Sequence, residues 1–341
     1  MKGLRAGKPP RIPLAAAVTT GALLASLTGC VTVHGESAVV PALSKAEAAK
    51  VLKTFVAKNN RANTAYDAEL NARIETGALG AIDQAGLKSR KEVRPKGNPD
   101  YQPLKLTDTR YLIPEQAGWP KFFVTDSRSN RKGQGRWFFV FQRQRADGPW
   151  KASYLSVVAP DRIPRFARDE HGRVKAVPVG GGSGLTVPPD ELSKRYTRYL
   201  QEGAGDDFAA GRHTTALREK REKALKRENV RNEFADRAAQ PPQYAPFGLR
   251  TKDGGALVFF TTLHHHKQTL PRGYKPQIED PLVKAMLSGT PKQSVTFVRV
   301  SEQAVTVPAK RAQGKGKSDG GSGGKVVFLS RIEGLTAARG E

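Results

Sequence analysis

Two helical patterns, each followed by a group of strand-like runs, are the feature of this 341-residue sequence that most restricts its fold. Ser44, with Glu47 three positions later, predicts a helix N-terminus with a capping box. Apolar residues at helical spacing over residues 48–56 predict the helix itself, which we expect to reach about Ile74 and to end at Gly77. Runs rich in β-type residues then predict four strands, at residues 109–113, 121–125, 137–143 and 150–158.

The same order recurs in the second half of the chain. Residues 190–200 have the spacing of an amphipathic helix, and residues 214–238 predict a second, highly charged helix. Four further strands are predicted at residues 255–266, 294–300, 303–307 and 325–332.

Because helices precede the strands in each half instead of alternating with them, the expected fold class is α+β, with two tandem units of a helix followed by a curled antiparallel sheet. We assign the first domain to residues 44–165 and the second to residues 190–341. The Gly- and Pro-rich segment 166–189 has the composition of a linker. The low-complexity stretch 310–324 is expected to be a disordered insert in the second domain.

The N-terminus has the features of a signal sequence over residues 1–29. Four basic residues and no acid precede an apolar run over residues 14–27, and small residues precede Cys30. The apolar run is shorter than the roughly 20 residues that a membrane-spanning helix needs. We therefore expect residues 1–29 to be removed and residues 30–43 to form a flexible tether.

The segment Leu27-Thr28-Gly29-Cys30 resembles the lipobox of bacterial lipoproteins. The resemblance implies that signal peptidase II recognises Leu27, Thr28 and Gly29, and that the thiol of Cys30 receives a diacylglycerol. Cys30 is the only cysteine, so it has no partner for an internal disulfide. The expected location is the outer face of the bacterial cell membrane, with membrane lipid as a partner through Cys30. An ordinary signal peptide with a chance cysteine is the alternative.

Two wider resemblances concern the fold. The helix over residues 51–66 and the strands 137–143 and 150–158 resemble the cone-shaped fold of nuclear transport factor 2 and ketosteroid isomerase, here in tandem. The whole chain is also similar to a family of actinobacterial lipoproteins of unknown function, which implies a fold and a location but no reaction. The residues that carry this similarity are Cys30, Ile113-Pro114, Trp119-Pro120, Phe141-Gln142-Arg143 before Trp150-Lys151, and Gly334-Leu335-Thr336-Ala337.

The formal net charge of +25 favours anionic partners. Outside a bacterium these are lipid headgroups, an anionic envelope polymer or an envelope protein. Export, and the lack of Lys/Arg clusters interleaved with aromatic residues, argue against nucleic acid. A solvated surface that only confers solubility is the alternative.

The charged helix offers the candidate contacts for such a partner. Ion pairs at i,i+4 spacing, from Glu219 to Lys223 and from Glu222 to Lys226, predict a surface helix. The functional interpretation is a basic helix face that rests on anionic headgroups or wall polymer. The candidate residues are Arg218, Lys220, Arg221, Lys223, Lys226 and Arg227.

Histidines are the one candidate for a metal site. On a strand, His264 and His266 point to one face and His265 to the other. A His-x-His pair suits zinc, which normally takes a third protein ligand, and no third ligand lies nearby in the sequence. Polar histidines at a strand end are the alternative.

No motif in a credible context predicts an enzyme, and no cofactor is expected. Gly320–Gly324 satisfies G-x-S-x-G, but this motif requires a preceding strand and a following helix. Acids that could act in a cone cavity show no diagnostic spacing: Asp67, Glu69, Glu75, Asp83, Asp206 and Asp207. The sequence thus predicts a lipid-anchored binding or scaffold protein. The alternative is a cone-fold carrier or enzyme whose aromatic residues line an apolar cavity.

Overall fold

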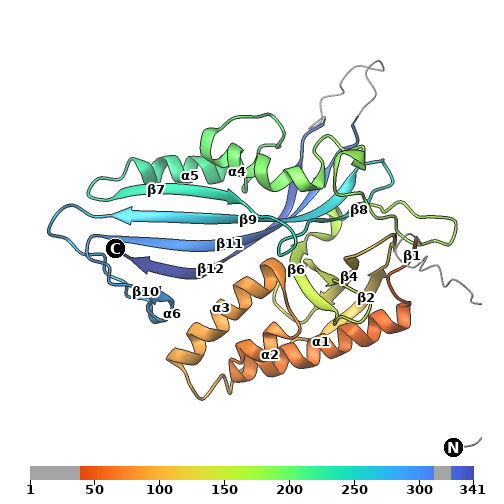
Figure 1. Ribbon diagram of the computed structural model, residues 1–341, viewed down its shortest axis with the longest axis horizontal. Helices are drawn as coiled ribbons and strands as arrows, with labels where there is room; N and C mark the ends of the chain where they lie inside the picture. Colours follow the sequence, from red (N-terminus) through yellow and green to blue (C-terminus); the bar gives the residue numbers. More distant parts are fainter. Residues whose placement is uncertain (1–38, 311–323) are drawn as a thin grey trace, which may run out of the picture. The chain divides into compact units, whose positions relative to one another are not determined.

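The structure, a computed structural model, describes residues 39–310 and 324–341 (Figure 1). The predicted signal sequence, Cys30 and most of the predicted insert, with its G-x-S-x-G match, lie outside the described residues. The described chain is a mixed α+β structure with two main open sheets, both largely antiparallel.

The first helix, α1 (Lys45–Ala65), begins with the predicted capping box. Ser44 Oγ accepts a hydrogen bond from Glu47 N at 3.2 Å, and Glu47 Oε2 accepts one from Ser44 N at 2.7 Å. The helix ends because Tyr66 adopts a left-handed conformation with a φ of 52°. The expected continuation to about residue 74 is therefore wrong, and a separate short helix, α2 (Ala68–Ala72), follows.

Gly77 begins a helix instead of ending one. This helix, α3 (Gly77–Val93), has no counterpart in the sequence prediction. Gly77 has a φ of +60°, and a Cβ atom there would lie 3.2 Å from Ser153 Cβ. The glycine thus lets the start of α3 approach the last strand of the first sheet.

The first main sheet contains the four predicted strands in the order β2-β4-β5-β6, all antiparallel. A separate two-stranded pair joins β1 to β3, so that Val40 lies opposite Gln116. The end of the predicted tether, residues 40–43, is therefore held against the domain, with Ala42 buried. The bounds are β1 (Val40–Pro41), β2 (Leu106–Leu112), β3 (Glu115–Gln116), β4 (Lys121–Ser129), β5 (Arg136–Arg143) and β6 (Lys151–Val158).

The second main sheet has the order β10-β12-β11-β9-β7, with β8 paired to β9. Helices α4 and α5 run along this sheet (Figure 1). Its strands are antiparallel except for β10, which runs parallel to β12. The bounds are α4 (Leu192–Glu202), α5 (Thr215–Leu225), β7 (Arg231–Ala238), β8 (Phe247–Arg250), β9 (Ala256–Thr269), α6 (Pro281–Ala285), β10 (Leu287–Ser288), β11 (Ser294–Val307) and β12 (Val327–Gly340).

Two predictions for this half are wrong in their boundaries. The charged helix α5 stops at Leu225, and residues 231–238 form β7. Asn229, with a φ of 60°, lies in the turn between them, and β7 then pairs with β9 over its whole length, so sheet pairing overrides the helical pattern. The strands predicted at 294–300 and 303–307 are one continuous strand, β11.

The segment 166–189 connects the two halves through three short 3-10 turns in and around it, and it contributes to the core. Ala176 forms a bridge to β8, Phe166 forms one to the residue after β8, and Val174 and Val177 are buried. Its composition resembles that of a linker, but its backbone is tied to the second sheet. The turns are η1 (Pro160–Arg162), η2 (Gly181–Ser183) and η3 (Pro189–Glu191).

One hydrophobic cluster contains side chains from both halves. Phe122 and Phe138 of the first sheet belong to the same buried cluster as Phe247, Leu257 and Phe259 of the second. Contacts gather the described residues, 39–310 and 324–341, into one compact unit. The aromatic residues of each half also pack among themselves, Phe123 with Phe141 at 4.9 Å in one half, and ring pairs around Phe328 in the other.

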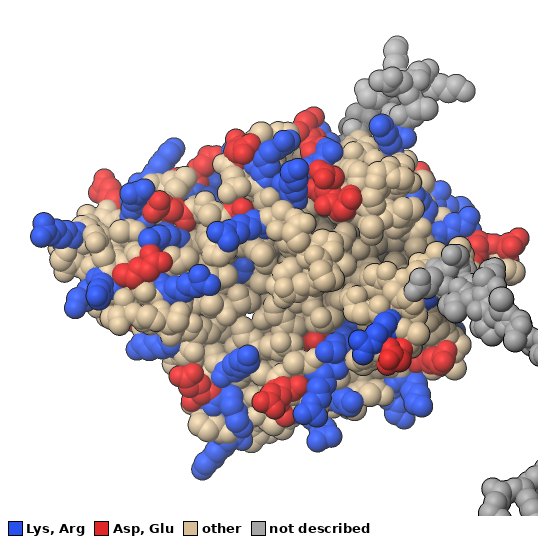
Figure 2. Space-filling view, viewed as in Figure 1, with Lys and Arg blue, Asp and Glu red and all other residues tan. Residues whose placement is uncertain are grey.

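Charged side chains lie mostly around the edge of the face seen in Figure 2, where Lys and Arg outnumber Asp and Glu. None of the helices in the described part of the chain is both long and apolar enough to cross a membrane.

Candidate anion-binding pocket

The structure brings the predicted histidines and the predicted basic helix together in one pocket. The pocket has a volume of about 580 Å³ and lies between α5 and the face of the second sheet. We call it the α5 pocket. Its polar and charged lining is Glu219, Lys220, Arg221, Lys223, Arg227, Asn232, His264, His265, His266, Gln268, Arg299 and Glu333.

Strand register explains why these side chains meet. Asp236 of β7 lies opposite His264 of β9, which lies opposite Arg299 of β11. Because side chains alternate along a strand, these residues share the face that α5 covers. His266 shares that face with His264, and its ring stacks on Phe234 at 4.4 Å.

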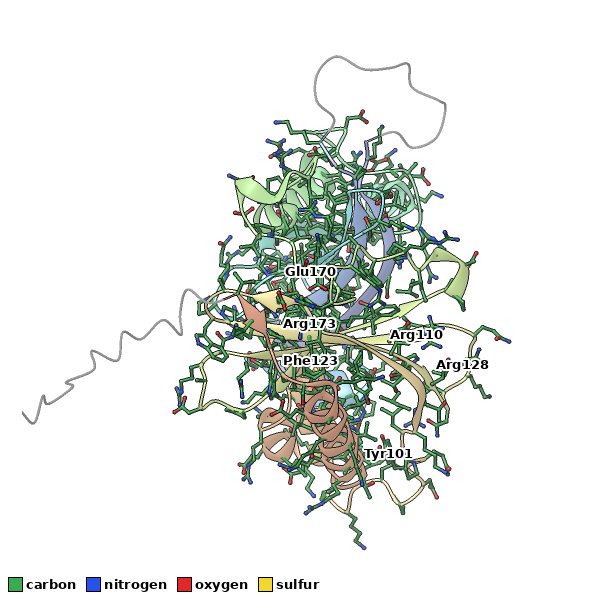
Figure 3. The ribbon with its side chains drawn as sticks, turned by 90° about the vertical axis from the view of Figure 1, so that its right-hand side faces the viewer. Tyr101, Arg110, Phe123, Arg128, Glu170 and Arg173 are labelled. Atoms are coloured by element: carbon green, nitrogen blue, oxygen red, sulfur yellow. The ribbon has the colours of Figure 1, made fainter. Side chains whose placement is uncertain are left out.

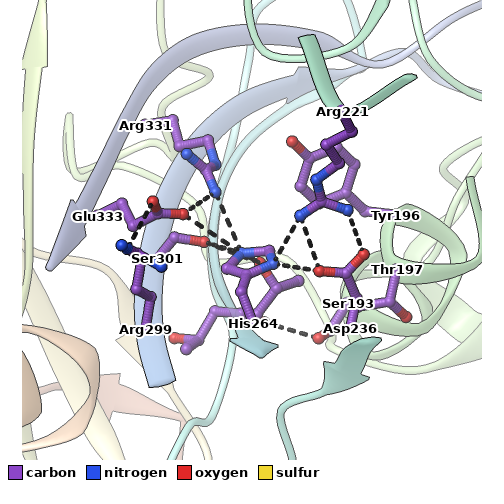
Figure 4. Close-up of polar contacts among 12 residues, drawn as sticks. Ser193, Tyr196, Thr197, Arg221, Asp236, His264, Arg299, Ser301, Arg331 and Glu333 are labelled. Carbon is purple, nitrogen blue, oxygen red and sulfur yellow. Dashed lines mark hydrogen bonds and ion pairs between the residues drawn. The ribbon is translucent and has the colours of Figure 1, made fainter. Parts of the chain in front are cut away.

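His264 is buried at the centre of a polar network (Figure 4). Its Nδ1 lies 2.5 Å from Asp236 Oδ1, and its Nε2 lies 2.7 Å from Ser301 Oγ. Arg331 Nη2 is 3.1 Å from the same Nε2. Since a guanidinium has only donors, Nε2 accepts from Arg331. Nδ1 carries the proton and donates it to Asp236, which is nearer than Arg221 Nη2 at 3.5 Å, and Arg221 Nη2 in turn donates to Asp236.

Burial and charge set the protonation states in this network. Burial lowers the pKa of His264, and the nearby Arg331 lowers it further, against the opposing effect of Asp236. Burial opposes ionisation of Asp236, but hydrogen bonds from His264 and Arg221 prevail and lower its pKa. Arg221 donates to both carboxylate oxygens of Asp236, at 2.5 and 2.9 Å. The network therefore contains a neutral imidazole, that of His264, beside the ionised carboxylate of Asp236, which accepts hydrogen bonds on both oxygens.

Asp236, His264 and Ser301 have the connectivity of a hydrolase triad. Ser301, however, is fully buried and does not line the α5 pocket. Its hydroxyl also lies 2.9 Å from Thr262 Oγ1 and accepts from Gln303 Nε2 at 2.5 Å. An attacking hydroxyl needs an open side toward its substrate, so the arrangement fits a network that holds Arg221 and Arg331 in place.

Three of the four ring nitrogens of His264 and His266 already have hydrogen-bond partners. Both ring nitrogens of His264 are engaged, and Nε2 of His266 is 2.8 Å from Asn232 Oδ1. Burial, with Arg299 and Arg221 nearby, lowers the pKa of His266 to about 4. Among residues 39–310 and 324–341, no three His, Cys, Asp or Glu side chains form a group suited to a metal ion.

The candidate residues of the basic helix have three different environments. Arg221 points inward to Asp236, and Arg218 lies over the Tyr199 ring and pairs with Glu222 at 3.5 Å. This i,i+4 pair takes the place of the two that the sequence predicted. Lys220, Lys223 and Arg227 line the α5 pocket, and Lys226 is exposed outside its lining.

The acids considered for cone-cavity chemistry are scattered, except for two. Asp67 caps α2, Asp206 pairs with Lys325, and Asp207 pairs with Arg195. Glu69 lies in the first turn of α2.

Glu75 and Asp83 lie together in the interior, near a third acid that the sequence did not single out, Glu302 of β11. Burial, together with the nearby carboxyls of Asp83 and Glu302, raises the pKa of Glu75. Burial raises the pKa of Asp83 to about 6. Burial also raises the pKa of Glu302. None of the three lines the α5 pocket.

Sequence reasoning found the histidines and the cations but missed Asp236, Ser301, Arg331 and Glu333. The available signal was polar residues at every second position inside otherwise apolar strands, as in Arg299-x-Ser301 and Arg331-x-Glu333. Asp236 was missed because its segment was assigned to a helix.

The matching family is described as "Domain of unknown function (DUF8094)", and it matches residues 39–340. The chain therefore belongs to this family.

More particularly, the chain is 45% identical over 341 residues to an "Uncharacterized lipoprotein" of Streptomyces avermitilis, covering 100% of this chain and 98% of that protein. It is 43% identical over 336 residues to "Uncharacterized lipoprotein SCO2278" of Streptomyces coelicolor, covering 98% of each chain. A more distant relative, "Uncharacterized lipoprotein SCO6871" of Streptomyces coelicolor, is 25% identical over 320 residues, with 84% of this chain and 86% of that protein covered. No solved structure matches the chain.

Proposed function

We propose that the protein is a lipid-anchored envelope protein that binds an anionic component of the cell envelope in the α5 pocket. The anchor at Cys30 is supported by the Leu27–Cys30 sequence and by the names of the relatives, which are lipoproteins. An anchor formed after export implies the outer face of the membrane.

The observation that carries the binding function is the cluster of unneutralised cations on the rim of the α5 pocket. Lys220, Lys223 and Arg227 make no ion pair with any described residue. Deeper in the pocket, Arg299 lies 3.8 Å from Glu333, and Arg221 is neutralised by Asp236. Glu219, the exposed acid of the same lining, offsets one of the three charges on the rim, so positive charge remains in excess among the exposed lining residues, and long-range attraction favours an anionic group there.

The floor of the pocket offers neutral hydrogen-bonding groups and a ring. Asn232, Gln268 and His266 lie beside Phe234. Asn232 Oδ1 already accepts from Gln268 Nε2, and Asn232 Nδ2 donates to Ala224 O. Gln268 Oε1 has no hydrogen-bond partner among the described residues, so such a lining suits a phosphate or carboxylate carried on a hydroxylated unit: the cations bind the charge and Gln268 Oε1 accepts from a hydroxyl. An anionic wall polymer has this chemistry.

We also propose that the protein is not an enzyme and that each half is a unit of the cone-shaped type. The first point is supported by the burial of Ser301 and its bonds to three side chains. The second is supported by the order of the elements and by Phe55 of α1, which packs against Phe139 and Phe141 of the first sheet. Packed aromatic clusters in both halves favour a binding module over a carrier with an apolar cavity.

Binding of a soluble poly(glycerol phosphate) tests the proposal directly. The variant Lys220→Gln/Lys223→Gln/Arg227→Gln should weaken binding at least tenfold. Salt at 0.5 M should also weaken binding of the unaltered protein, because at that concentration exposed charges are screened beyond a Debye length of about 4–5 Å. The matched control is Lys88→Gln/Arg94→Gln/Lys96→Gln, which removes three exposed cations of the α3 region. Equal losses in both variants would reduce the α5 pocket to part of a general basic surface.

A further inference from the structure

A second basic concavity lies outside the α5 pocket, on the first sheet. It has a volume of about 1120 Å³ and is bounded by β2, β4, the β4–β5 turn and residues 160–168. Six cations line it, and we call it the arginine groove: Arg110, Arg128, Arg136, Arg165, Arg168 and Lys252.

The floor of the arginine groove is held by ion pairs. Arg136 is buried and bonds to Asp126 and, at 2.7 Å, to Asp108. Arg110 lies 3.6 Å from Asp126, and Arg128 lies 3.4 Å from Asp108. Three guanidinium groups thus share two carboxylates, and the exposed ends of Arg110 and Arg128 project toward solvent (Figure 3).

The opposite rim carries cations without acidic partners. Arg165, Arg168 and Lys252 are exposed, and none forms an ion pair with a described residue. The backbone fixes their spacing, since Lys252 N donates to Arg165 O at 2.7 Å. Six cations therefore face two acids, and a concave wall concentrates the resulting positive potential.

The groove adjoins the place where the chain enters from its N-terminal side. A neighbouring pocket of about 640 Å³ is lined by Pro41 of β1 and by Lys45, and it shares Tyr111 and Arg168 with the arginine groove. Val39 and Val40 are exposed there, with 62% and 42% of their surface accessible. Cations and exposed apolar side chains side by side match the surface of a membrane, where headgroups meet acyl chains.

Chain length keeps this surface near a membrane-bound Cys30. Val40 is the tenth residue after Cys30, and ten fully extended residues reach roughly 35 Å. The pairing of Val40 with Gln116 then fixes the end of that reach at β1, whose Pro41 lines the pocket that shares Tyr111 and Arg168 with the arginine groove. In Figure 1, β1 lies far from α5, so the α5 pocket is left free for another partner.

We propose that the arginine groove docks on anionic phospholipid headgroups, whose phosphates contact Arg110, Arg165, Arg168 and Lys252. The proposal shares with the proposed function the anchor at Cys30, which sets the distance to the membrane. It does not depend on what the α5 pocket binds.

Vesicle binding by residues 39–341, which lack Cys30 and therefore the anchor, tests the docking alone. Vesicles contain either phosphatidylglycerol and phosphatidylcholine in equal parts or phosphatidylcholine only. The variant Arg165→Gln/Arg168→Gln/Lys252→Gln should lose roughly 100-fold in affinity for the anionic vesicles, since each cation at such a surface contributes about fivefold. The control Lys88→Gln/Arg94→Gln/Lys96→Gln, which removes the same charge elsewhere, should change affinity less than threefold.

Three outcomes would overturn the docking proposal. Equal losses in the two variants would show that only net charge matters, and equal binding to both kinds of vesicle would show that headgroup charge does not. Binding of soluble poly(glycerol phosphate) by the groove, without binding to anionic vesicles, would assign the groove to a polymer. Thermal stability of each variant, measured alone, separates loss of binding from loss of fold.

Discussion

Glu302 is a fully buried carboxyl whose Oε2 accepts a hydrogen bond from Leu155 N at 3.0 Å, while Oε1 has no partner among the described residues. Burial raises its pKa above that of the unfolded chain. A raised pKa means that the folded state holds the proton more tightly. The stability that this contributes is present below the unfolded pKa and is lost as pH rises through the folded pKa.

Replacing Glu302 with Gln should therefore make the protein more stable at pH 8, because a neutral amide does not have to take up a proton on folding there. The gain should shrink toward pH 4, where both states of Glu302 are protonated. Urea unfolding at pH 4, 6 and 8 measures it.

Glu333→Gln is the matched control for this pH dependence. Burial opposes ionisation of Glu333, but Arg331 and other neighbours lower its pKa, so its contribution is present above the unfolded pKa and is lost in acid. This variant should lose stability at pH 8 and approach the unaltered protein at low pH. If the unfolding free energies of the two variants changed with pH in the same direction, the opposite pKa shifts given for Glu302 and Glu333 would be wrong.

His264 should matter for stability through its hydrogen bonds. His264→Ala removes the acceptor for Arg331 and the donor to Asp236, both in a buried setting, and should destabilise the protein by about 2–4 kcal/mol. His265→Ala removes a ring whose Nδ1 has no hydrogen-bond partner among the described residues, and should cost less than about 1 kcal/mol. Denaturant unfolding compares the two, and equal effects would mean that the network contributes nothing beyond side-chain burial.

At the scale of elements, alternation and capping could be predicted from the sequence, because both depend on neighbouring residues. The capping box at Ser44 and the strands of the first sheet are confirmed by the structure. Helix α3 was missed because its three glycines indicate weak helix propensity. Helix α3 depends on packing against strands that are distant in sequence. The segment of β7 was assigned to a helix because its pairing with β9 is also distant in sequence and leaves no local signal.

The same limit applies to the candidate site. His264 and the cations of α5 were identifiable by residue type, but their meeting in one pocket depends on sheet register. Ser301 and Asp236 became candidates only once that register was known.

Contact between α3 and β12 depends on the absence of a side chain at Gly334. A Cβ atom there would lie 2.3 Å from Ile82 Cγ2. Gly334→Ala should therefore destabilise the protein by about 1–3 kcal/mol through overpacking.

A second substitution separates this clash from a backbone effect. In the Ile82→Ala background, Gly334→Ala should cost much less, because the clashing methyl group is gone. Unfolding free energies of the two single variants and the double variant give the coupling. Additive effects would show that the clash is not the cause.

At the scale of the whole molecule, the two halves contribute to one common hydrophobic cluster, although the sequence predicted two separate domains. The sequence predicted domains at 44–165 and 190–341, with a Gly- and Pro-rich linker between them. The cluster that contains Phe138 and Leu257 instead extends across both halves, and residues 166–189 supply buried side chains to the cores. Because separate domains need separate cores, this packing predicts that the halves unfold together.

All three tryptophans lie in the first half, so their fluorescence reports on that half alone. Leu257→Ala, in the second half, should destabilise the protein by about 2–5 kcal/mol. If the shared cluster couples the halves, the tryptophan transition in urea should move by the full amount, together with the loss of amide protection in β9 and β11. An unchanged tryptophan transition with earlier loss of protection in β9 would instead support two independently folding domains.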